Sequence, residues 1–316
     1  MIRITVNALV LFLLCAGCMR KKDMSRQDMV FIEGGEFIMG TTSEIIDSLV
    51  EHYGFPNDFI GSEYPPHKVT LSSFYIDKYE VTNADFKEFI DRNPMWQKDN
   101  IPDSLHNGDY LKQWQNNTFP DGEGMYPVVY INWYAAMEYC KCLNKRLSTE
   151  AEWEYVASNR GKHQAYPWGN DKPDSTKANY LSLIGKAIDV GSYSPNELGV
   201  YDLAGNVWEF TLDSWSSDFY RKSPEDNPVN GLKFYDINEL YNVKSRRVIR
   251  GGSWGGAEIN LRISFRDNHP PKGAGNHVGF RCVKEATTSN KTPLKQAFIQ
   301  KVSWHLKSMK CKNKHI

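Results

Sequence analysis

The segment RVIRGGSWGGAEINLRISFRD, which runs from Arg247 to Asp267, decides the fold of this chain. The residues RVIR at positions 247–250 lead into the GGSW motif at residues 251–254, and the whole segment contains no cysteine. Around it, from Gly161 to Arg281, glycine, asparagine, proline and tryptophan recur without sustained periodicity. This pattern predicts an α+β domain with little regular structure, in which many loops are attached to a small sheet.

The composition indicates a globular protein and argues against a nucleic-acid partner. The 316 residues are 41% apolar and 13% aromatic, which is enough for one large domain or two small ones around a substantial core. Lys and Arg number 38, and so do Asp and Glu. Because these charges cancel, no global field attracts nucleic acid or another strongly charged polymer.

Residues 1–18 have the layout of a secretory signal. One basic residue, Arg3, precedes an apolar run that is short for a transmembrane helix, and small residues precede a cysteine. The CAGC end resembles a bacterial lipobox, in which Cys18 would be acylated and become the first residue. Ordinary signal cleavage is the alternative. A basic tether at residues 19–28 then leads to the domain.

The first part of the domain contains strand patterns. Residues 29–40, MVFIEGGEFIMG, place two apolar segments around two glycines and predict a hairpin. Residues 67–80, HKVTLSSFYIDKYE, are a further strand candidate. The polar, irregular sequence from Asn93 to Tyr126 is expected to form a surface insertion.

Two helices carry clear start signals. Thr82 is expected to cap one of them, and Thr149 with Glu152 forms a capping box for the other. The residues expected on the buried faces are Phe86, Phe89 and Ile90 in the first helix, and Trp153 and Val156 in the second.

The end of the chain, residues 286–316, is a basic tail with seven lysines and no acidic residue. Five apolar residues fall at helical spacing between the lysines: Leu294, Phe298, Val302, Leu306 and Met309. This pattern predicts a basic amphipathic helix on a membrane or a partner. Docking on its own domain, or fraying, is the alternative.

Eight blocks, read in order, resemble the formylglycine-generating enzyme family, also called the sulfatase-modifying factor family. They span Met29 to Val283 and read MVFIEGGEFIMG, KVTLSSFYIDKYEVTNADFKEFI, PVVYINWYAAMEYC, RLSTEAEWEYVA, YPWGN, NELGVYDLAGNVWEF, RVIRGGSW and GFRC. The resemblance implies one domain at residues 29–285 with the family's fold, a loop-rich variant of the C-type-lectin-like fold.

The family's oxidising chemistry is not expected here. Its oxidising members carry two cysteines after the GGS segment, bind copper through them, and convert a substrate cysteine to formylglycine. The corresponding positions are Gly256 and Leu261. Thiolates are the soft ligands that Cu(I) requires, and neither side chain has a donor atom. The resemblance therefore implies no copper and no copper-dependent cysteine oxidation.

The resemblance also implies two stabilising features. One is a disulfide between Cys140 and Cys282. The other is a structural calcium site in the YDLAGNVWE block, where oxygen donors would suit a hard cation. Its ligands would be the side chains of Asp202 and Glu209 and the backbone carbonyls of Gly205 and Val207. The alternative is that the two acidic side chains only cap the turn by hydrogen bonds.

Three functions are open at this stage. The first is a non-catalytic envelope lipoprotein that binds a protein partner; the resemblance implies it, because family members of this type occur in the gliding and type IX secretion machinery of Bacteroidetes. The second is an enzyme with altered chemistry, for which Arg250, Ser253, Asn206 and Arg281 are groove candidates, although buried hydrogen bonds explain them as well. The third is a surface module that binds carbohydrate.

The first function is the one that the missing thiols and the anchor motif favour. It implies an envelope protein partner, a membrane attachment through the lipid, and a location at the outer membrane facing the periplasm.

Overall fold

The structure is a computed structural model that describes residues 28–54, 56, 60–232 and 237–286. The expected signal segment with Cys18, nearly all of the tether, and the basic tail from residue 287 lie outside the described residues. Within the described ranges, no helix is both long enough and apolar enough to cross a membrane.

Short strands form three small sheets in the described part of the chain. The first sheet has the order β1-β4-β10-β5, the second pairs β2 with β3, and the third has the order β8-β7-β6-β9. All neighbouring strands are antiparallel except β6 and β9. The strands are β1 Met29–Ile32, β2 Gly35–Met39, β3 His67–Leu71, β4 Phe74–Asp77, β5 Arg146–Leu147, β6 Trp208–Ser214, β7 Arg247–Arg250, β8 Asp267–His269, β9 Val278–Gly279 and β10 Cys282–Glu285.

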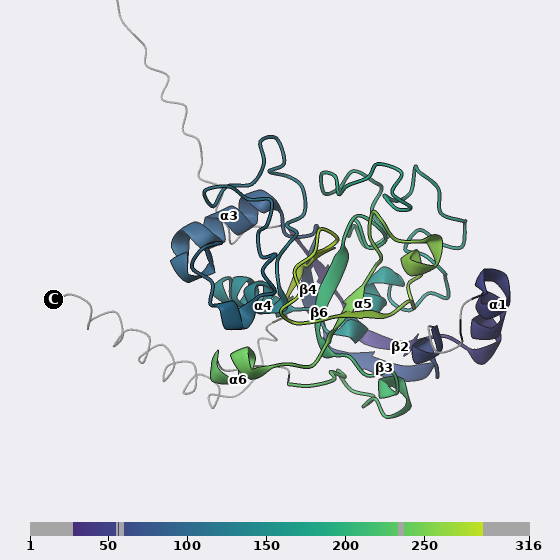
Figure 1. Cartoon of the computed structure of the whole chain (residues 1–316). Coiled ribbons are helices and arrows are strands. Elements are labelled where there is room, and N and C mark those ends of the chain that lie inside the picture. The colour runs from purple at the N-terminus through teal and green to yellow at the C-terminus, as the bar shows by residue number, and fades with distance from the viewer. Residues whose placement is uncertain (1–27, 55, 57–59, 233–236, 287–316) are drawn as a thin grey trace, which may run out of the picture.

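Helices α3 and α4 lie together on one side of the sheets, whereas α1 lies at the opposite end beyond β2 and β3 (Figure 1). Long loops without regular elements cover the top of the molecule in this view. The helices are α1 Ser43–Tyr53, α3 Asn83–Arg92, α4 Trp133–Cys142, α5 Glu150–Ala157 and α6 Ile237–Asn242; short 3₁₀ turns are η2 Gly61–Glu63, η3 Pro94–Trp96, η4 Asp103–Leu105, η5 Phe219–Arg221 and η6 Glu258–Leu261. The expected α+β class with many loops is confirmed.

The two predicted helix starts are confirmed by capping hydrogen bonds. The Thr82 hydroxyl accepts a hydrogen bond from the Asp85 N–H at 3.2 Å, and the Thr149 hydroxyl accepts one from the Glu152 N–H at 3.1 Å. In both helices the acidic side chain accepts a bond from the N–H of the capping residue, which completes the capping box. All five residues expected on the two inner faces are buried.

The predicted hairpin at residues 29–40 is wrong. Strand β1 pairs with β4, whereas β2 pairs with β3, so the two apolar segments belong to different sheets. A Cβ at Gly34 would collide with the carbonyl oxygen of Leu71, and the chain therefore needs glycine where it crosses between sheets. The strand candidate at residues 67–80 divides at the same crossing into β3 and β4.

The surface insertion expected at residues 93–126 is wrong in its burial, although the segment is irregular as predicted. Its apolar residues join the same core cluster as Phe86 and Phe89 of α3. The buried members are Trp96, Ile101, Leu105, Tyr110, Leu111 and Trp114. Large apolar side chains spaced between polar residues thus anchor an irregular segment that has no periodic pattern.

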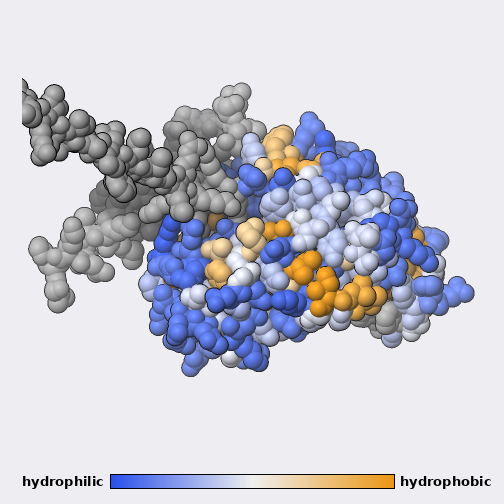
Figure 2. Space-filling view, turned by 90° about the horizontal axis from the view of Figure 1, so that it is seen from above, coloured by the Kyte–Doolittle hydropathy of each residue, from blue (hydrophilic) through white to orange (hydrophobic). Residues whose placement is uncertain are grey.

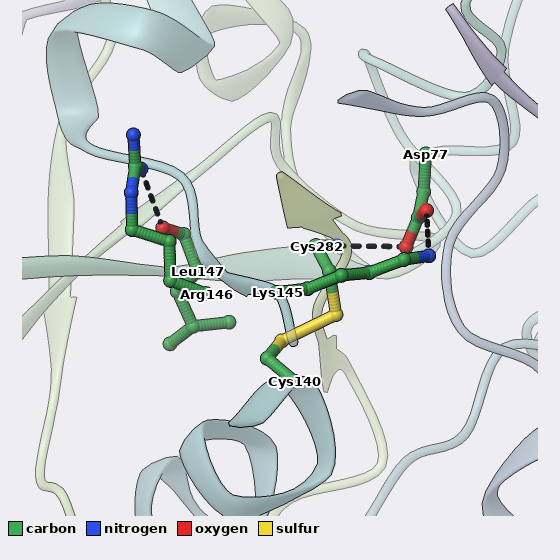
Figure 3. Close-up of a disulfide and its surroundings, with 6 residues drawn as sticks. All are labelled: Asp77, Cys140, Lys145, Arg146, Leu147 and Cys282. Carbon is green, nitrogen blue, oxygen red and sulfur yellow. Dashed lines mark hydrogen bonds and ion pairs between the residues drawn. A yellow bond between two sulfur atoms is a disulfide. The ribbon is translucent and has the colours of Figure 1, made fainter. Parts of the chain in front are cut away.

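The disulfide between Cys140 and Cys282 is confirmed. It joins the last turn of α4 to the start of β10, with the two Cα atoms 5.9 Å apart (Figure 3). Beside it, an Asp77 oxygen accepts a hydrogen bond from the Cys282 N–H at 3.1 Å, and the other oxygen pairs with Lys145 at 2.5 Å. Cys142, two residues further along α4, is exposed and free.

We expect removal of this disulfide to lower the free energy of unfolding by about 2–5 kcal/mol, because it closes a long loop in the unfolded chain. The Cys140→Ala/Cys282→Ala double variant should show this loss in urea denaturation followed by tryptophan fluorescence. Cys142→Ala is the matched control, and its unfolding curve should coincide with that of the parent. Equal stability of the double variant and the parent would contradict the prediction.

Candidate functional site

The GGSW motif leaves β7 through a turn that only glycine fits. Gly251 and Gly252 both have positive φ, at 95° and 75°. A Cβ on Gly251 would lie 3.2 Å from the Trp153 ring, and a Cβ on Gly252 would lie 3.0 Å from the Asn260 carbonyl oxygen. The turn therefore brings the residues after β7 against α5 and η6.

Gly256 and Leu261, which the resemblance assigns to the family's two thiol positions, are both held by contacts within the domain. The Gly256 carbonyl accepts a hydrogen bond from the Leu181 N–H at 2.9 Å. Leu261 is only 1% exposed and packs in an apolar cluster with Tyr166, Tyr180 and Ala204. Neither position offers an accessible side-chain donor, so thiolate chemistry has no counterpart at these two residues.

Arg250 lies in a buried ion-pair cluster. Its guanidinium donates to Glu150 and to Glu154, each at 2.6 Å, and Arg266 donates to both oxygens of Glu150 at 2.6 and 2.7 Å. Burial opposes ionisation of Glu150, but the charges of Arg266 and Arg250 outweigh it and lower the pKa of this carboxyl. The cluster thus joins β7, α5 and the segment before β8.

Arg281 occupies a second buried ion pair. It donates to both oxygens of Glu209 at 2.7 and 2.6 Å, and Trp153 donates to the same carboxylate at 3.1 Å. All four groove candidates, Arg250, Ser253, Asn206 and Arg281, are at most 2% exposed. The structure therefore places them in the interior rather than on an open groove wall.

The turn from Asp202 to Glu209 contains the implied calcium ligands. Asp202 accepts a hydrogen bond from the Gly191 N–H at 2.6 Å, and burial raises its pKa to about 6. Glu209 is occupied by Arg281 and Trp153. Among the described residues, no three His, Cys, Asp or Glu side chains are arranged as a metal cluster.

Glu80 is a third buried carboxylate at this turn, and sequence reasoning missed it. It is 1% exposed; Asn206 donates to one of its oxygens at 2.9 Å, while the other oxygen, Oε1, is buried without a hydrogen-bond partner. Burial, then the charges of Asp202 and Glu209, raise the pKa of Glu80 well above its ordinary value. The only sequence signal is an acidic residue two positions before the helix cap Thr82.

A small hollow of about 140 Å³ lies beside the GGSW motif. Trp254, which is half-buried and donates to the Asn276 carbonyl at 3.0 Å, forms part of its wall. The remaining lining residues are Asn83, Gln113, Glu123, Tyr126, Pro127, Val129, Tyr130, Gly185, Lys186, Ala187 and Asn276. Aromatic walls with amide groups between them suit a single side chain of a bound molecule.

The loop at residues 181–184 next to this hollow exposes three aliphatic side chains. Leu181, Leu183 and Ile184 are 52%, 57% and 50% exposed. Leu181 and Ser182 both have positive φ, at 52° and 55°, which costs about 1–3 kcal/mol for a non-glycine residue. The Ser182 N–H donates to the Trp254 carbonyl at 2.7 Å, so the loop is fixed to the GGSW motif.

The loop-rich α+β fold, the eight sequence blocks between Met29 and Val283, and the Cys140–Cys282 disulfide together indicate a domain of the sulfatase-modifying factor class. The chain belongs to the sulfatase-modifying factor family, whose model, described as the sulfatase-modifying factor enzyme 1-like domain, matches residues 16–286.

Relatives of different kinds contain this domain. The chain is 33% identical over 262 residues to the serine/threonine-protein kinase Pkn1 of Chlamydia trachomatis. The matching region covers 82% of this chain but only 38% of the kinase. It is 31% identical over 304 residues to the inactive C-alpha-formylglycine-generating enzyme 2 of Bos taurus, covering 82% of this chain and 88% of that protein. The structure of PvdO from Pseudomonas aeruginosa has the same fold, with a TM-score of 0.59 and 24% identity over 82% of this chain and 94% of that one.

We expect Arg250→Met to lower the free energy of unfolding by about 3–5 kcal/mol, because it leaves Glu150 and Glu154 with less compensation in the interior. Chemical denaturation followed by tryptophan fluorescence measures the loss. Arg92→Met is the matched control: Arg92 is exposed and pairs with Glu88, so the change should stay within about 1 kcal/mol. A midpoint for Arg250→Met equal to that of the control would contradict the structural role.

Proposed function

We propose that this chain is a non-catalytic, lipid-anchored envelope protein whose domain binds a protein partner within an envelope assembly of the gliding or secretion type. The observation that carries the proposal is the replacement of both thiol positions by Gly256 and Leu261, the second of which fills an apolar cluster. A relative that is named as inactive is similar over most of its length.

The surface for this partner is formed by the exposed loop at residues 181–184 and the adjacent hollow. Three exposed aliphatic side chains in one short loop are unusual on a protein surface unless another molecule covers them. Figure 2 views the molecule from above, where apolar patches interrupt a largely hydrophilic surface. The partner would place one side chain in the hollow beside Trp254 and cover the loop.

In-cell cross-linking of a tagged chain, followed by identification of its neighbours, tests this surface. We expect envelope-assembly proteins among the neighbours of the parent, and their loss in the Leu183→Asp/Ile184→Asp variant, because a charge opposes burial of the loop. Met95→Asp, at an exposed apolar residue of another segment, is the control and should keep the neighbours. Cys18→Ser should release the protein from the membrane fraction.

Other outcomes would overturn the proposal. Aldehyde formation on a sulfatase-type cysteine peptide, above a metal-free control, would indicate an enzyme. Recovery of a glycan that depends on Trp254 would indicate the carbohydrate-binding alternative. An unchanged set of neighbours in Leu183→Asp/Ile184→Asp would exclude this surface.

We also propose a calcium site at the turn, with Glu80 and Asp202 as its acidic ligands and the Gly205 and Val207 carbonyls as neutral ones. What supports it is the unpartnered Glu80 Oε1 in the interior, together with the excess of acidic over basic charge around it. Glu209 remains the partner of Arg281 in this arrangement. Bound calcium would neutralise the carboxylates and fix the turn.

Calcium should raise the melting temperature of the parent. If the dissociation constant is about 10⁻⁴–10⁻³ M, as in extracellular modules, 10 mM calcium adds about 1.4–2.7 kcal/mol of stability. Glu80→Gln should abolish this gain, and in chelator it should be no less stable than the parent because one buried charge is gone. Glu197→Gln, at an exposed site, is the control. Equal melting of the parent in calcium and in chelator would contradict the site.

A further inference from the structure

A larger pocket, of about 600 Å³, lies between α1 and the body of the domain. Its volume falls in the range of small-molecule sites. It shares no lining residue with the hollow beside Trp254 or with the loop at residues 181–184.

One wall of the pocket is a complete face of α1. Positions 45, 48, 49, 52 and 53 recur at the spacing of one helical stripe, and all five line the pocket. Both ends of the helix are capped, by the Thr42 side chain and by the Gly54 N–H, which donates to the Val50 carbonyl at 2.8 Å. Ile46, seven residues before Tyr53 and therefore at the edge of this stripe, is buried in the core. The stripe therefore lines the pocket, while Ile46 attaches the helix to the core of the domain.

The apolar part of the lining is accessible to a ligand. Ile38 and Ile45 are 48% and 49% exposed, and Leu49 is partly buried beside them. Ile263 is buried and closes the apolar surface from the opposite wall. An aliphatic body placed here would remove these side chains from water.

The charged groups of the lining favour an anion. Lys172 and Lys162 are exposed, and Lys162 has only a surface ion pair with Glu197, which a ligand can replace. Arg262 is 6% exposed and pairs with Glu63 through one terminal nitrogen, while its Nε is buried without a hydrogen-bond partner. The pocket thus offers two cationic side chains outside and a guanidinium inside.

The two acidic residues of the lining do not cancel these charges. Glu154 is neutralised by Arg250, at 2.6 Å, from behind the wall. Glu258 is half-buried near Tyr166; burial and then the charge of Glu258 raise the pKa of Tyr166, which also hydrogen-bonds Glu258. Glu258 therefore remains one carboxylate against two exposed lysines, which leaves the open part of the lining with more positive than negative charge.

We propose that this pocket binds an amphiphilic carboxylate, whose aliphatic body lies against the Ile45 and Leu49 face of α1 and whose carboxylate is held by Lys172 and Lys162. This site is separate from the partner surface and does not depend on it. A medium-chain fatty acid and a short apolar peptide with a free carboxyl terminus share this chemistry.

Calorimetric titration of the full chain, carrying Cys18→Ser to prevent acylation, tests the site with octanoate as the probe. Octanoate should bind, and octylamine, which has the same chain and the opposite charge, should not. Lys172→Glu and Ile45→Asp should each weaken octanoate binding by about tenfold or more. Lys284→Glu and Ile184→Asp, the same changes at exposed residues outside the pocket, should leave it unchanged.

One comparison distinguishes a fatty acid from a peptide carboxyl terminus as the ligand, and a second measurement shows whether each variant is folded. Tri-leucine with a free carboxyl terminus is titrated beside its amide: tighter binding of the free peptide than of octanoate assigns the site to peptide termini, and the reverse assigns it to fatty acids. Melting curves confirm that each variant is folded. Absence of binding by both carboxylates, equal binding of octylamine, or equal loss in the control variants would overturn the proposal.

Discussion

The paired buried charges of Arg250, Arg266, Glu150 and Glu154 are the interaction on which the rest of this domain depends. Short strands and long loops provide few regular backbone ladders, so side chains must hold the elements together. Each arginine donates at least two charge-assisted hydrogen bonds to carboxylates at 2.6–2.7 Å. Removing one partner would leave an uncompensated charge in the interior, which is why the cluster resists change.

Because buried side-chain contacts hold the elements together, the family's fold does not require cysteines at positions 256 and 261. The residues before the thiol positions, from β7 through Gly251 and Gly252, serve packing against α5 and η6. Gly256 and Leu261 come after that turn, where a hydrogen bond from Leu181 and a small apolar cluster are sufficient to fill the space. Glycine and leucine at these two positions therefore leave the contacts that support the fold in place.

The sequence predicted well what depends on local chemistry. The caps at Thr82 and Thr149 follow from one side chain and the N–H groups next to it, and the disulfide followed from the family's blocks. The pairing of β1 with β4 could not be derived, because the apolar pattern is the same whichever strand is the neighbour. Arg250 and Arg281 were groove candidates because a sequence does not reveal which carboxylate will meet a guanidinium. Glu80 was missed for the same reason, since its partners lie more than a hundred residues away.

The buried clusters around Arg250 and Arg281 differ in the balance of acidic and basic side chains, and this difference is why we propose calcium only at the second. Around Arg250, two arginines face two glutamates, and both glutamates are directly paired. Around Arg281, one arginine faces Glu80, Asp202 and Glu209. It forms its ion pair with Glu209, and its other N–H groups donate to backbone carbonyls, including that of Tyr201. The first group is complete as folded. The second has an acidic excess and a buried Glu80 oxygen without a hydrogen-bond partner, and the calcium that we propose there would neutralise part of that charge.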